Sequence, residues 1–507
     1  MNDLYLEFDV IYSISDLHIS VCGQRQIFFA GDLLAATIDN LRQDIEDNQR
    51  VALVINGDFI DFLALSDAKL FDREKAASKL LSIMEDEENK PIFEALAKFA
   101  SDDRSNTLVI VVGNHDIELC LPTVQETLLQ CLAGGDPIAR GRIIIIDNGT
   151  GFRCQVGGCN ILFMHGNEND RINQIDHEGL RQEVYQLKHD TGRKSAVKPA
   201  IGTILVDRVI HKLKESYPLI DLIKPELKDN PPLLDAVMDD LDSLPSDLRS
   251  VIAKYTWSRT PFLEANQPGP GNLTDTPQPL PLQIEGDEML MNIFYHLRNG
   301  SGFNENQLDE LDDHDLSLQK WLGYLRHPLV DFFLKRPMTS LLSKQERTER
   351  ARQKLLDLQD EREAAQLLEG DDSIISNIMD VPGIIGPAIH VLVAGHTHFR
   401  RFRHISLNRF YCNTGTWIPT VILTPQVLEN KKYFQRFLQI ITQSDTRKAL
   451  DELRREWPDD PPLVRDEPSM VRIKRIRRCG CSVELLDVIE NGTFTPVPET
   501  YKYEVQP

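Results

Sequence analysis

Residues 108–116 read LVIVVGNHD, and the rest of the chain can be understood from this stretch. Four consecutive β-branched residues predict a short strand that is covered on both faces of a sheet. The glycine that follows permits an abrupt turn. Asn114, His115 and Asp116 would then project from the carboxyl end of the strand. In open α/β sheets this is the edge at which ligands and catalytic groups collect.

Four other stretches have the same form, an apolar run that ends in histidine or aspartate, in two cases after an intervening glycine. We expect the runs to be strands at residues 10–15, 51–56, 160–164 and 390–394. The polar residues that follow them are Asp16, His18, Asp58, His165, His396 and His398. Strands alternate with helical patterns in the first third of the chain, which predicts βαβ units and a sheet layered with helices. We therefore expect the fold to bring these residues together.

With Asn114 added, the strand ends carry seven oxygen and imidazole donors and no thiolate. Such a set suits Mn²⁺, Fe or Zn²⁺. Seven donors are too many for one tetrahedral site but suffice for two metals that share a bridging carboxylate. Two metals roughly 3.5–4 Å apart can hold a hydroxide and clamp a phosphate for in-line displacement. We therefore predict two divalent metal ions as cofactors, with Mn²⁺ as the first choice and Fe or Zn²⁺ as alternatives.

The order of the motifs, D-x-H, G-D-x-x-D, G-N-H-D, H-G and G-H-x-H, resembles that of the calcineurin-like metallophosphoesterase superfamily. The resemblance covers roughly residues 9–166 and 388–425, less than half of the chain. It implies an α/β fold, a four-layer α/β/β/α sandwich, here with a large helical insertion. It also implies a metal-dependent phosphoric ester hydrolase that acts on a phosphate monoester or diester.

The resemblance further implies a role for each matching residue. One metal would be held by Asp16, His18 and His398. The other would be held by Asn114, His165 and His396, with Asp58 as the bridge. His115 would protonate the leaving alkoxide or bind the phosphate, since a histidine near neutral pKa can supply a proton. Asp61 would orient His115 and support its positive form.

Some further residues near the motifs are candidates for substrate or ligand contacts. Arg171, Arg400 and Arg401 follow metal motifs, and the planar guanidinium group suits a phosphate. The alternative for these arginines is a solvated surface. Glu168 and Asp170 follow His165 and are candidates for hydrogen bonds that orient the metal ligands.

Composition limits the class of protein. The 507 residues carry a formal charge of −22, which disfavours broad non-specific binding to nucleic acid. The N-terminus lacks the pattern of a signal peptide, and no apolar run approaches the length of a transmembrane helix. The eight cysteines are scattered and do not form the pattern of a disulfide framework. We therefore expect a cytoplasmic protein with reduced thiols and no membrane partner.

The chain changes character after the H-G motif. Little strand pattern and much helical pattern extend to about residue 387. We predict a helical insertion at 168–387, which leaves and rejoins the core beside the metals and would act as a cap. It also offers a surface for a homo-oligomer or a larger complex. The remaining segments are a core at 1–167 and 388–425, a helical excursion at 426–470 and core strands at 471–507.

The predicted partner is a phosphate-ester substrate, such as a nucleotide or a nucleic acid. The first hypothesis is a phosphoesterase acting on a small or nucleotide-like ester. A metal-dependent nuclease of the repair-exonuclease type is an alternative, because GNHD and GDxxD also resemble that branch. A third hypothesis is a subunit of a larger complex. A lipid-intermediate pyrophosphatase is disfavoured, since His115 stands where that branch tends to have arginine.

Overall fold

The structure is a computed structural model of the chain. It describes residues 6–224, 232–237, 343–359 and 385–507, apart from gaps at 24, 47, 66–68, 103–105, 171–172, 190–196, 235, 387, 407, 444, 477–478 and 498–502. The chain divides into two compact units. The first takes in residues 1–222, 360–422 and 443–507, and the second takes in 223–359 and 423–442.

The larger sheet of the first unit has eight strands among the described residues. Strands β2, β3, β4 and β5 run parallel in that order, and β13 pairs antiparallel with β2. The strands are β2 (Val10–Ile14), β3 (Val51–Asn56), β4 (Thr107–Val111), β5 (Ile143–Ile146), β13 (Ser469–Arg475), β14 (Cys481–Val488), β15 (Phe494–Pro496) and β16 (Tyr503–Val505). The parallel order places the carboxyl ends of β2, β3 and β4 at one edge.

A second sheet has six strands in the described part of the chain, in the order β1-β6-β7-β8-β10-β9. Strands β7 and β8 lie side by side and parallel, although more than 200 residues separate them in sequence. The strands are β1 (Glu7–Phe8), β6 (Phe152–Val156), β7 (Cys159–Phe163), β8 (Val391–Ala394), β9 (Arg400–Ser406) and β10 (Arg409–Thr414). The carboxyl ends of β7 and β8 therefore also meet.

The inner faces of the two sheets share one hydrophobic core. Val54 and Val109 of the larger sheet lie in the same cluster as Val393 and Phe410 of the smaller one. Four of the cysteines, Cys154, Cys159, Cys412 and Cys481, are buried in this core. All eight cysteines are free thiols, as the sequence predicts. This face-to-face packing is that of a β-sandwich.

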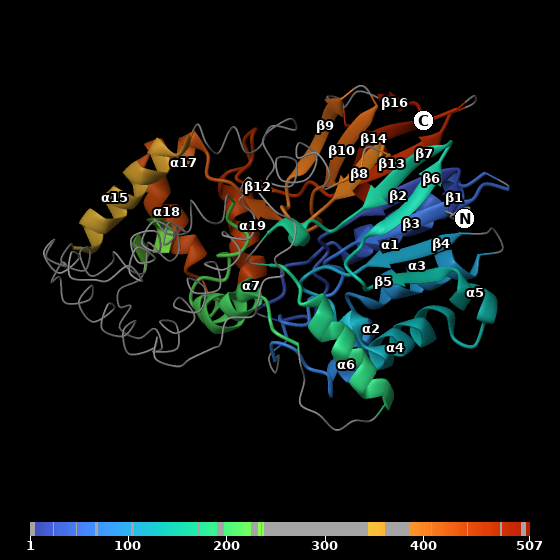
Figure 1. The fold of residues 1–507 in the computed structure, drawn as a ribbon. Coiled ribbons are helices and arrows are strands. Elements are labelled where there is room, and N and C mark those ends of the chain that lie inside the picture. The colour runs from blue at the N-terminus through green and yellow to red at the C-terminus, as the bar shows by residue number, and fades with distance from the viewer. Residues whose placement is uncertain are drawn as a thin grey trace, which may run out of the picture. The chain divides into compact units, whose positions relative to one another are not determined.

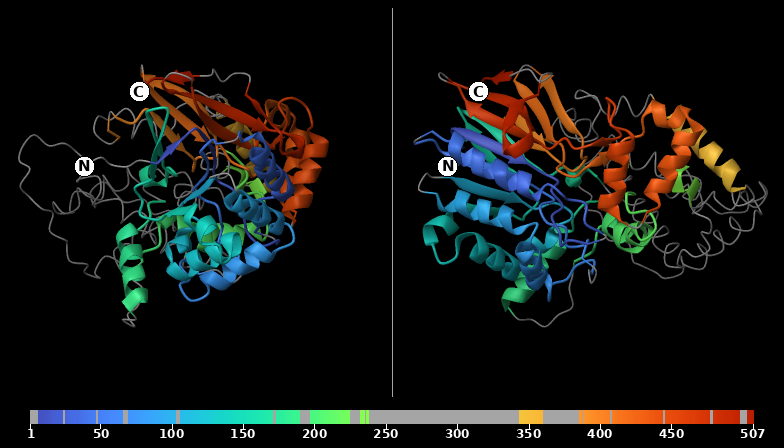
Figure 2. Two further views of the ribbon diagram at one scale, coloured as in Figure 1. Left: turned by 90° about the vertical axis from the view of Figure 1, so that its right-hand side faces the viewer. Right: turned by 180° about the vertical axis from the view of Figure 1, so that it is seen from behind.

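Helices cover the outer face of the larger sheet (Figure 1; Figure 2). They are α1 (Gly31–Asp44), α2 (Ala76–Glu85), α3 (Lys90–Ser101), α4 (Pro122–Ala133) and α5 (Pro137–Gly141). The predicted break near Pro91 is present, because α3 begins there with proline in its first turn. Strands, two packed sheets and covering helices confirm the predicted α/β class.

The remaining described helices of the first unit are α6 (His177–His189), α7 (Ile201–Leu205), α8 (His211–Lys214) and α19 (Thr446–Glu456). Two short strands, β11 (Thr420–Val421) and β12 (Val464–Arg465), form a separate pair. Arg73 holds α6 through an ion pair with the buried Glu183, at 2.9 Å. The predicted boundaries of the helical insertion stay a prediction, because much of residues 168–387 lies outside the described residues.

The second unit contains α15 (Lys344–Asp357), α17 (Pro425–Glu429) and α18 (Lys431–Ile441). Ser343 and Glu346 form the capping box that their spacing predicts at the start of α15. Arg352 of α15 donates to the carbonyl of Leu428 at 2.7 Å. No helix in the described part of the chain is both long and apolar enough to cross a membrane.

Candidate metal centre

Five turns supply the seven predicted ligands, and each turn follows a strand. Asp16 and His18 follow β2, Asp58 follows β3 and Asn114 follows β4 in the larger sheet. The smaller sheet supplies the other three, His165 after β7 and His396 and His398 after β8. Because the sheets pack face to face, the two sets of strand ends lie opposite one another.

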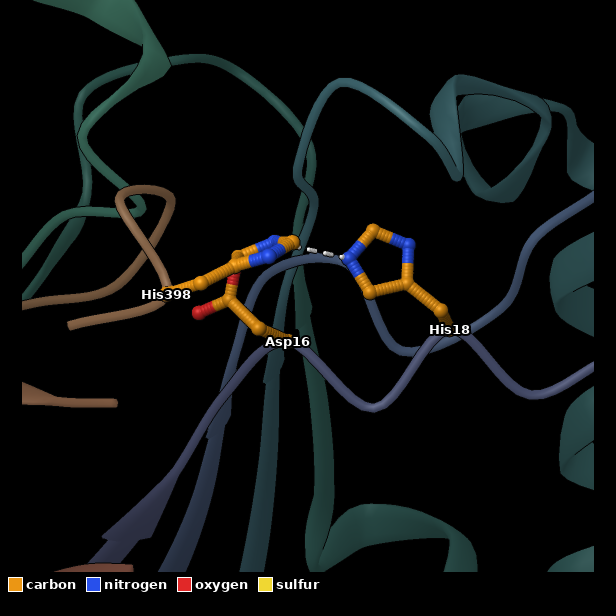
Figure 3. Close-up of side chains that lie close together, drawn as sticks. All are labelled: Asp16, His18 and His398. Carbon is orange, nitrogen blue, oxygen red and sulfur yellow. Dashed lines mark hydrogen bonds and ion pairs between the residues drawn. The ribbon is translucent and has the colours of Figure 1, made fainter. Parts of the chain in front are cut away.

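The first cluster consists of Asp16, His18 and His398, whose ligand atoms all lie within 4.8 Å of one another. His398 Nε2 is 3.4 Å from Asp16 Oδ1 and 3.2 Å from His18 Nε2. Figure 3 shows the three side chains directed toward one another from two turns, with Asp16 and His18 on one and His398 on the other. One carboxylate and two imidazoles at this spacing can hold a divalent ion such as Mn²⁺, Fe²⁺ or Zn²⁺.

The second cluster consists of Asp58, His165 and His396. His165 Nε2 lies 3.1 Å from Asp58 Oδ2. The same Asp58 oxygen is 3.7 Å from His18 Nε2 of the first cluster. Asp58 is therefore within reach of both clusters, as a bridging carboxylate must be.

Asn114 completes the predicted set. It is buried, and its Oδ1 accepts no hydrogen bond from any described residue. Its neighbours fix it beside Asp58, because the N–H of His115 donates to Asp58 Oδ1 at 3.0 Å. A buried amide oxygen without a partner is unfavourable unless a ligand satisfies it. The donor set thus fits divalent metal ions, with Asn114 among the atoms that would hold them.

The backbone of these turns is strained. Asp16, His18, Asp58, His396 and His398 all have φ between 50° and 70°. Residues with a side chain rarely adopt this left-handed region, at a cost of order 1–3 kcal/mol each. Strain concentrated on five of the seven predicted ligands indicates that the fold holds them for function.

Glycines allow the turns to approach so closely. A Cβ on Gly113 would lie 2.3 Å from Asp58 Oδ1, and one on Gly395 would lie 2.5 Å from Asp16 Oδ2. Both glycines therefore let a backbone turn touch a carboxylate from another turn.

Hydrogen bonds orient the ligands from outside. The carbonyl of Asn56 lies 3.0 Å from His165 Nδ1, which leaves Nε2 directed at Asp58. The N–H of His396 donates to Asp16 at 3.0 Å. Asp116 accepts from the N–H groups of Gly113 and Phe59, at 2.6 and 2.7 Å. Asp116 thus joins the GNHD turn to the GDxxD loop.

His115 lies beside Asp61, and their predicted catalytic roles stay a prediction. His115 Nδ1 is 3.6 Å from Asp61 Oδ2, and the His115 ring packs edge-on against that of His18 at 4.7 Å between centroids. Asp61 Oδ1 accepts from the backbone N–H groups of Leu63 and Ala64. These bonds hold the carboxylate beside His115, and its Oδ2 is also 4.0 Å from His18 Nδ1.

The electrostatics of the cluster match a cation site. Burial raises the pKa of Asp16 to about 6. Burial opposes charge on His165, but Asp58 outweighs it and raises the pKa of His165 to about 10. In the same way Asp58 and Asp61 overcome burial and raise the pKa of His115 to about 9. The protonated His165 and His115 thus balance the negative charge of the buried carboxylates. Bound metal ions would take over this role and displace the proton of His165.

The three predicted substrate arginines lie in different settings. Arg171 lies outside the described residues. Arg400 forms ion pairs with Asp487 and Glu467. Arg401 is buried, and its guanidinium lies 5.2 Å from the centroid of the Phe399 ring. Contacts of these arginines with substrate stay a prediction.

Two supporting residues lie outside the motifs. Asp170 lies with its Oδ2 3.1 Å from His396 Nε2, so this candidate contacts a predicted ligand. Glu168 instead accepts from the N–H of Gly166. The sequence analysis missed Asn56, which orients His165. The only signal was a polar residue at the end of the apolar run VALVIN.

Residues 10–210 match the family model described as calcineurin-like phosphoesterase. This segment is therefore similar to the calcineurin-like phosphoesterases. That family acts on phosphate esters and uses divalent metals, which agrees with the clusters of aspartate and histidine. The match ends before β8, so it does not include His396 and His398. No curated protein matches the chain.

Proposed function

We propose that the protein is a dinuclear metal-dependent phosphoesterase that hydrolyses a phosphate monoester or diester. The observation that supports this most directly is the position of Asp58, which belongs to a candidate group with His18 and His115 and to another with His165 and His396. A carboxylate shared in this way suits two adjacent ions. Mn²⁺ is the first choice, and the cytoplasm is the proposed location.

The chain's own residues would divide the work. When bound, the two ions would neutralise the phosphate and supply the attacking oxygen. Asp16, His18 and His398 would hold one ion, Asn114, His165 and His396 the other, and Asp58 both. In the protein without bound metal, Asp58 and Asp61 raise the pKa of His115 to about 9, so its imidazole is protonated at neutral pH. It would give that proton to the leaving oxygen, while Asp61 keeps the imidazole in place.

The experiment is a metal titration with two readouts. The purified protein, stripped of metal, would be supplied with Mn²⁺, Fe²⁺ or Zn²⁺ and assayed on bis(4-nitrophenyl) phosphate and 4-nitrophenyl phosphate. Mass spectrometry of the native protein would count the bound ions. Two ions per chain and hydrolysis of either ester support the proposal. One ion, or two ions without hydrolysis of any ester, would contradict it.

A panel of linear dinucleotides and single-stranded DNA separates this function from that of a nuclease. Preference for DNA over the small diesters would favour the nuclease alternative. The predicted cap at 168–387 is proposed to select among these substrates.

A further inference from the structure

A pocket of about 270 Å³ is formed within the first unit by three segments of chain. One wall is formed by Val21, Cys22, Gly23 and Arg25, which follow His18 within a few positions. Ala64 and Leu65 form another and follow Asp61 in the same way. The third wall is formed by His211 and Lys214 of α8 and by Glu215, which follows this helix. Two of the three walls are thus direct continuations of loops that carry site residues.

Arg25 gives the pocket a positive charge. Its guanidinium donates to the carbonyl of Leu65 at 2.9 Å. Among the described residues no carboxylate lies within ion-pair distance of it. The remaining donors of the guanidinium group are those that suit a phosphate or a carboxylate.

His211 adds a buried hydrogen-bonding group. Its side chain is 5% exposed, and its Nδ1 has no hydrogen-bond partner within the described chain. Burial and the charge of Arg25 lower the pKa of His211 to about 4, so the imidazole is neutral at physiological pH. The pocket borders the Asp61–His115 pair, because the backbone N–H of Ala64, which lines it, donates to Asp61 Oδ1 at 3.1 Å.

Lys214 makes the pocket rigid. Its ammonium group is buried and donates to the carbonyl of Arg25 at 3.0 Å and to Asp221 at 2.7 Å. These bonds tie α8 to the loop after His18. Because Asp221 balances its charge, Lys214 positions the loop, and Arg25 is left as the group that can bind an anion.

We propose that this pocket receives the leaving group of the substrate and that Arg25 and His211 bind an anionic substituent on it, a phosphate or a carboxylate. The proposal rests on the proposed function, in which His115 protonates the leaving oxygen. Water adds to phosphorus, the P–O bond to the leaving group breaks, and the leaving oxygen takes the proton. Pockets that hold an entire small-molecule ligand usually have volumes from about 300 Å³ upward. This pocket, at about 270 Å³, is large enough for the leaving group alone.

The test uses three phenyl phosphodiesters that differ only in the leaving group. These are 4-nitrophenol, 3-carboxy-4-nitrophenol and 3-phosphonomethyl-4-nitrophenol. In the Mn²⁺-loaded protein we expect a higher kcat/KM for at least one anionic diester than for the neutral one. The preferred anion tells a carboxylate from a phosphate. In Arg25→Gln the ratio of anionic to neutral kcat/KM should fall roughly ten- to hundredfold.

A matched control and a binding measurement complete the design. Arg181→Gln removes an exposed arginine of α6 and should leave the ratio as in the wild type. Arg25→Lys, which keeps the charge, should retain part of the preference. Calorimetry with 3-phosphonomethyl-4-nitrophenol and its carboxylate analogue should show weaker binding to Arg25→Gln and His211→Leu than to the wild type.

The outcomes separate the two proposals. Hydrolysis of all three diesters at equal kcat/KM by the wild type would overturn the pocket proposal alone. Absence of hydrolysis would overturn the proposed function, and calorimetry would still decide the pocket. Equal affinity of wild type and Arg25→Gln for both free leaving groups would overturn the pocket proposal in either case.

Discussion

The two sheets contribute to the metal centre in different ways. The larger sheet supplies Asp16, His18, Asp58 and Asn114 from three adjacent parallel strands, all within the first 114 residues. The smaller sheet supplies its three histidines from β7 and β8, strands that pair although they lie far apart in sequence. One half of the centre is thus a product of local βαβ order, and the other depends on a long-range strand pairing.

This difference concerns assembly, because two of the three candidate groups among the described residues need both sheets, while the third, His18, Asp58 and His115, lies in the larger sheet alone. His398 of the smaller sheet completes the group of Asp16 and His18, and Asp58 of the larger sheet completes that of His165 and His396. Substitutions that cut the link between the sheets should therefore disturb both clusters. A substitution confined to one sheet should change mainly one property: the number of bound metal ions, the proton transfer to the leaving group, or the free energy of unfolding.

The largest effect is expected for Asp58→Asn, which weakens the residue shared by both clusters. Loss of the charge should reduce the bound metal below two ions and lower kcat/KM by more than about a thousandfold. Metal analysis and steady-state kinetics measure this. Asp32→Asn, an exposed change in the first turn of α1, is the control. Two retained ions with near-normal activity would show that Asp58 is not the shared ligand.

The next effect is expected for His115→Gln, which changes only the larger sheet. The variant should keep both ions and lose roughly 10²- to 10⁴-fold in kcat, because the leaving oxygen no longer receives a proton. An ester with a good leaving group, such as 4-nitrophenol, should lose less than an alkyl ester. Equal losses on the two esters would argue against a proton donor.

A smaller effect is expected for Asn56→Ala, which cuts a link between the sheets. Asn56 Nδ2 donates to the carbonyls of Met164 and Val393, at 2.9 and 3.2 Å, near the ends of β7 and β8. Leaving these buried groups unpaired should lower the free energy of unfolding by about 1–3 kcal/mol. Denaturant titration measures it, and metal affinity should fall as well. Unchanged affinity for both ions would mean that the sheets hold their ligands independently.

The smallest effect on activity is expected for Glu118→Gln, a change in the short helix Ile117–Cys120 that follows β4. Burial raises the pKa of Glu118 to about 8. The folded state keeps the proton at pH 7, whereas the unfolded chain releases it above about pH 4.5. Wild-type stability should therefore fall as pH rises from 4.5 to 8. Glutamine has no such proton, so the variant should gain about 3 kcal/mol at pH 7 and nothing below pH 4.

Thermal unfolding of both proteins across this pH range measures the difference. A gain that is independent of pH would assign the effect to packing rather than to the proton of Glu118.

Much of the fold could be predicted because the elements obey local rules. The predicted strand at 51–56 agrees with β3 to the residue. The helical excursion predicted at 426–470 contains more than one helix. Asp445 caps a new helix by accepting from the N–H of Lys448, so the segment forms α18 and α19. The two-residue β1 was missed, because so short a strand has no periodicity.

The sequence by itself determined which residues could bind metal, because oxygen and imidazole donors follow buried apolar runs, and strand ends are where an α/β sheet presents them. The tertiary structure decided which donors share a cluster, because the pairing of β7 with β8 and the packing of the two sheets are long-range events. Only the tertiary structure places the carbonyl of Asn56 next to His165 Nδ1 and brings Arg25 and His211 into one pocket. No periodicity encodes such contacts, since they depend on distances between segments that sequence spacing does not fix.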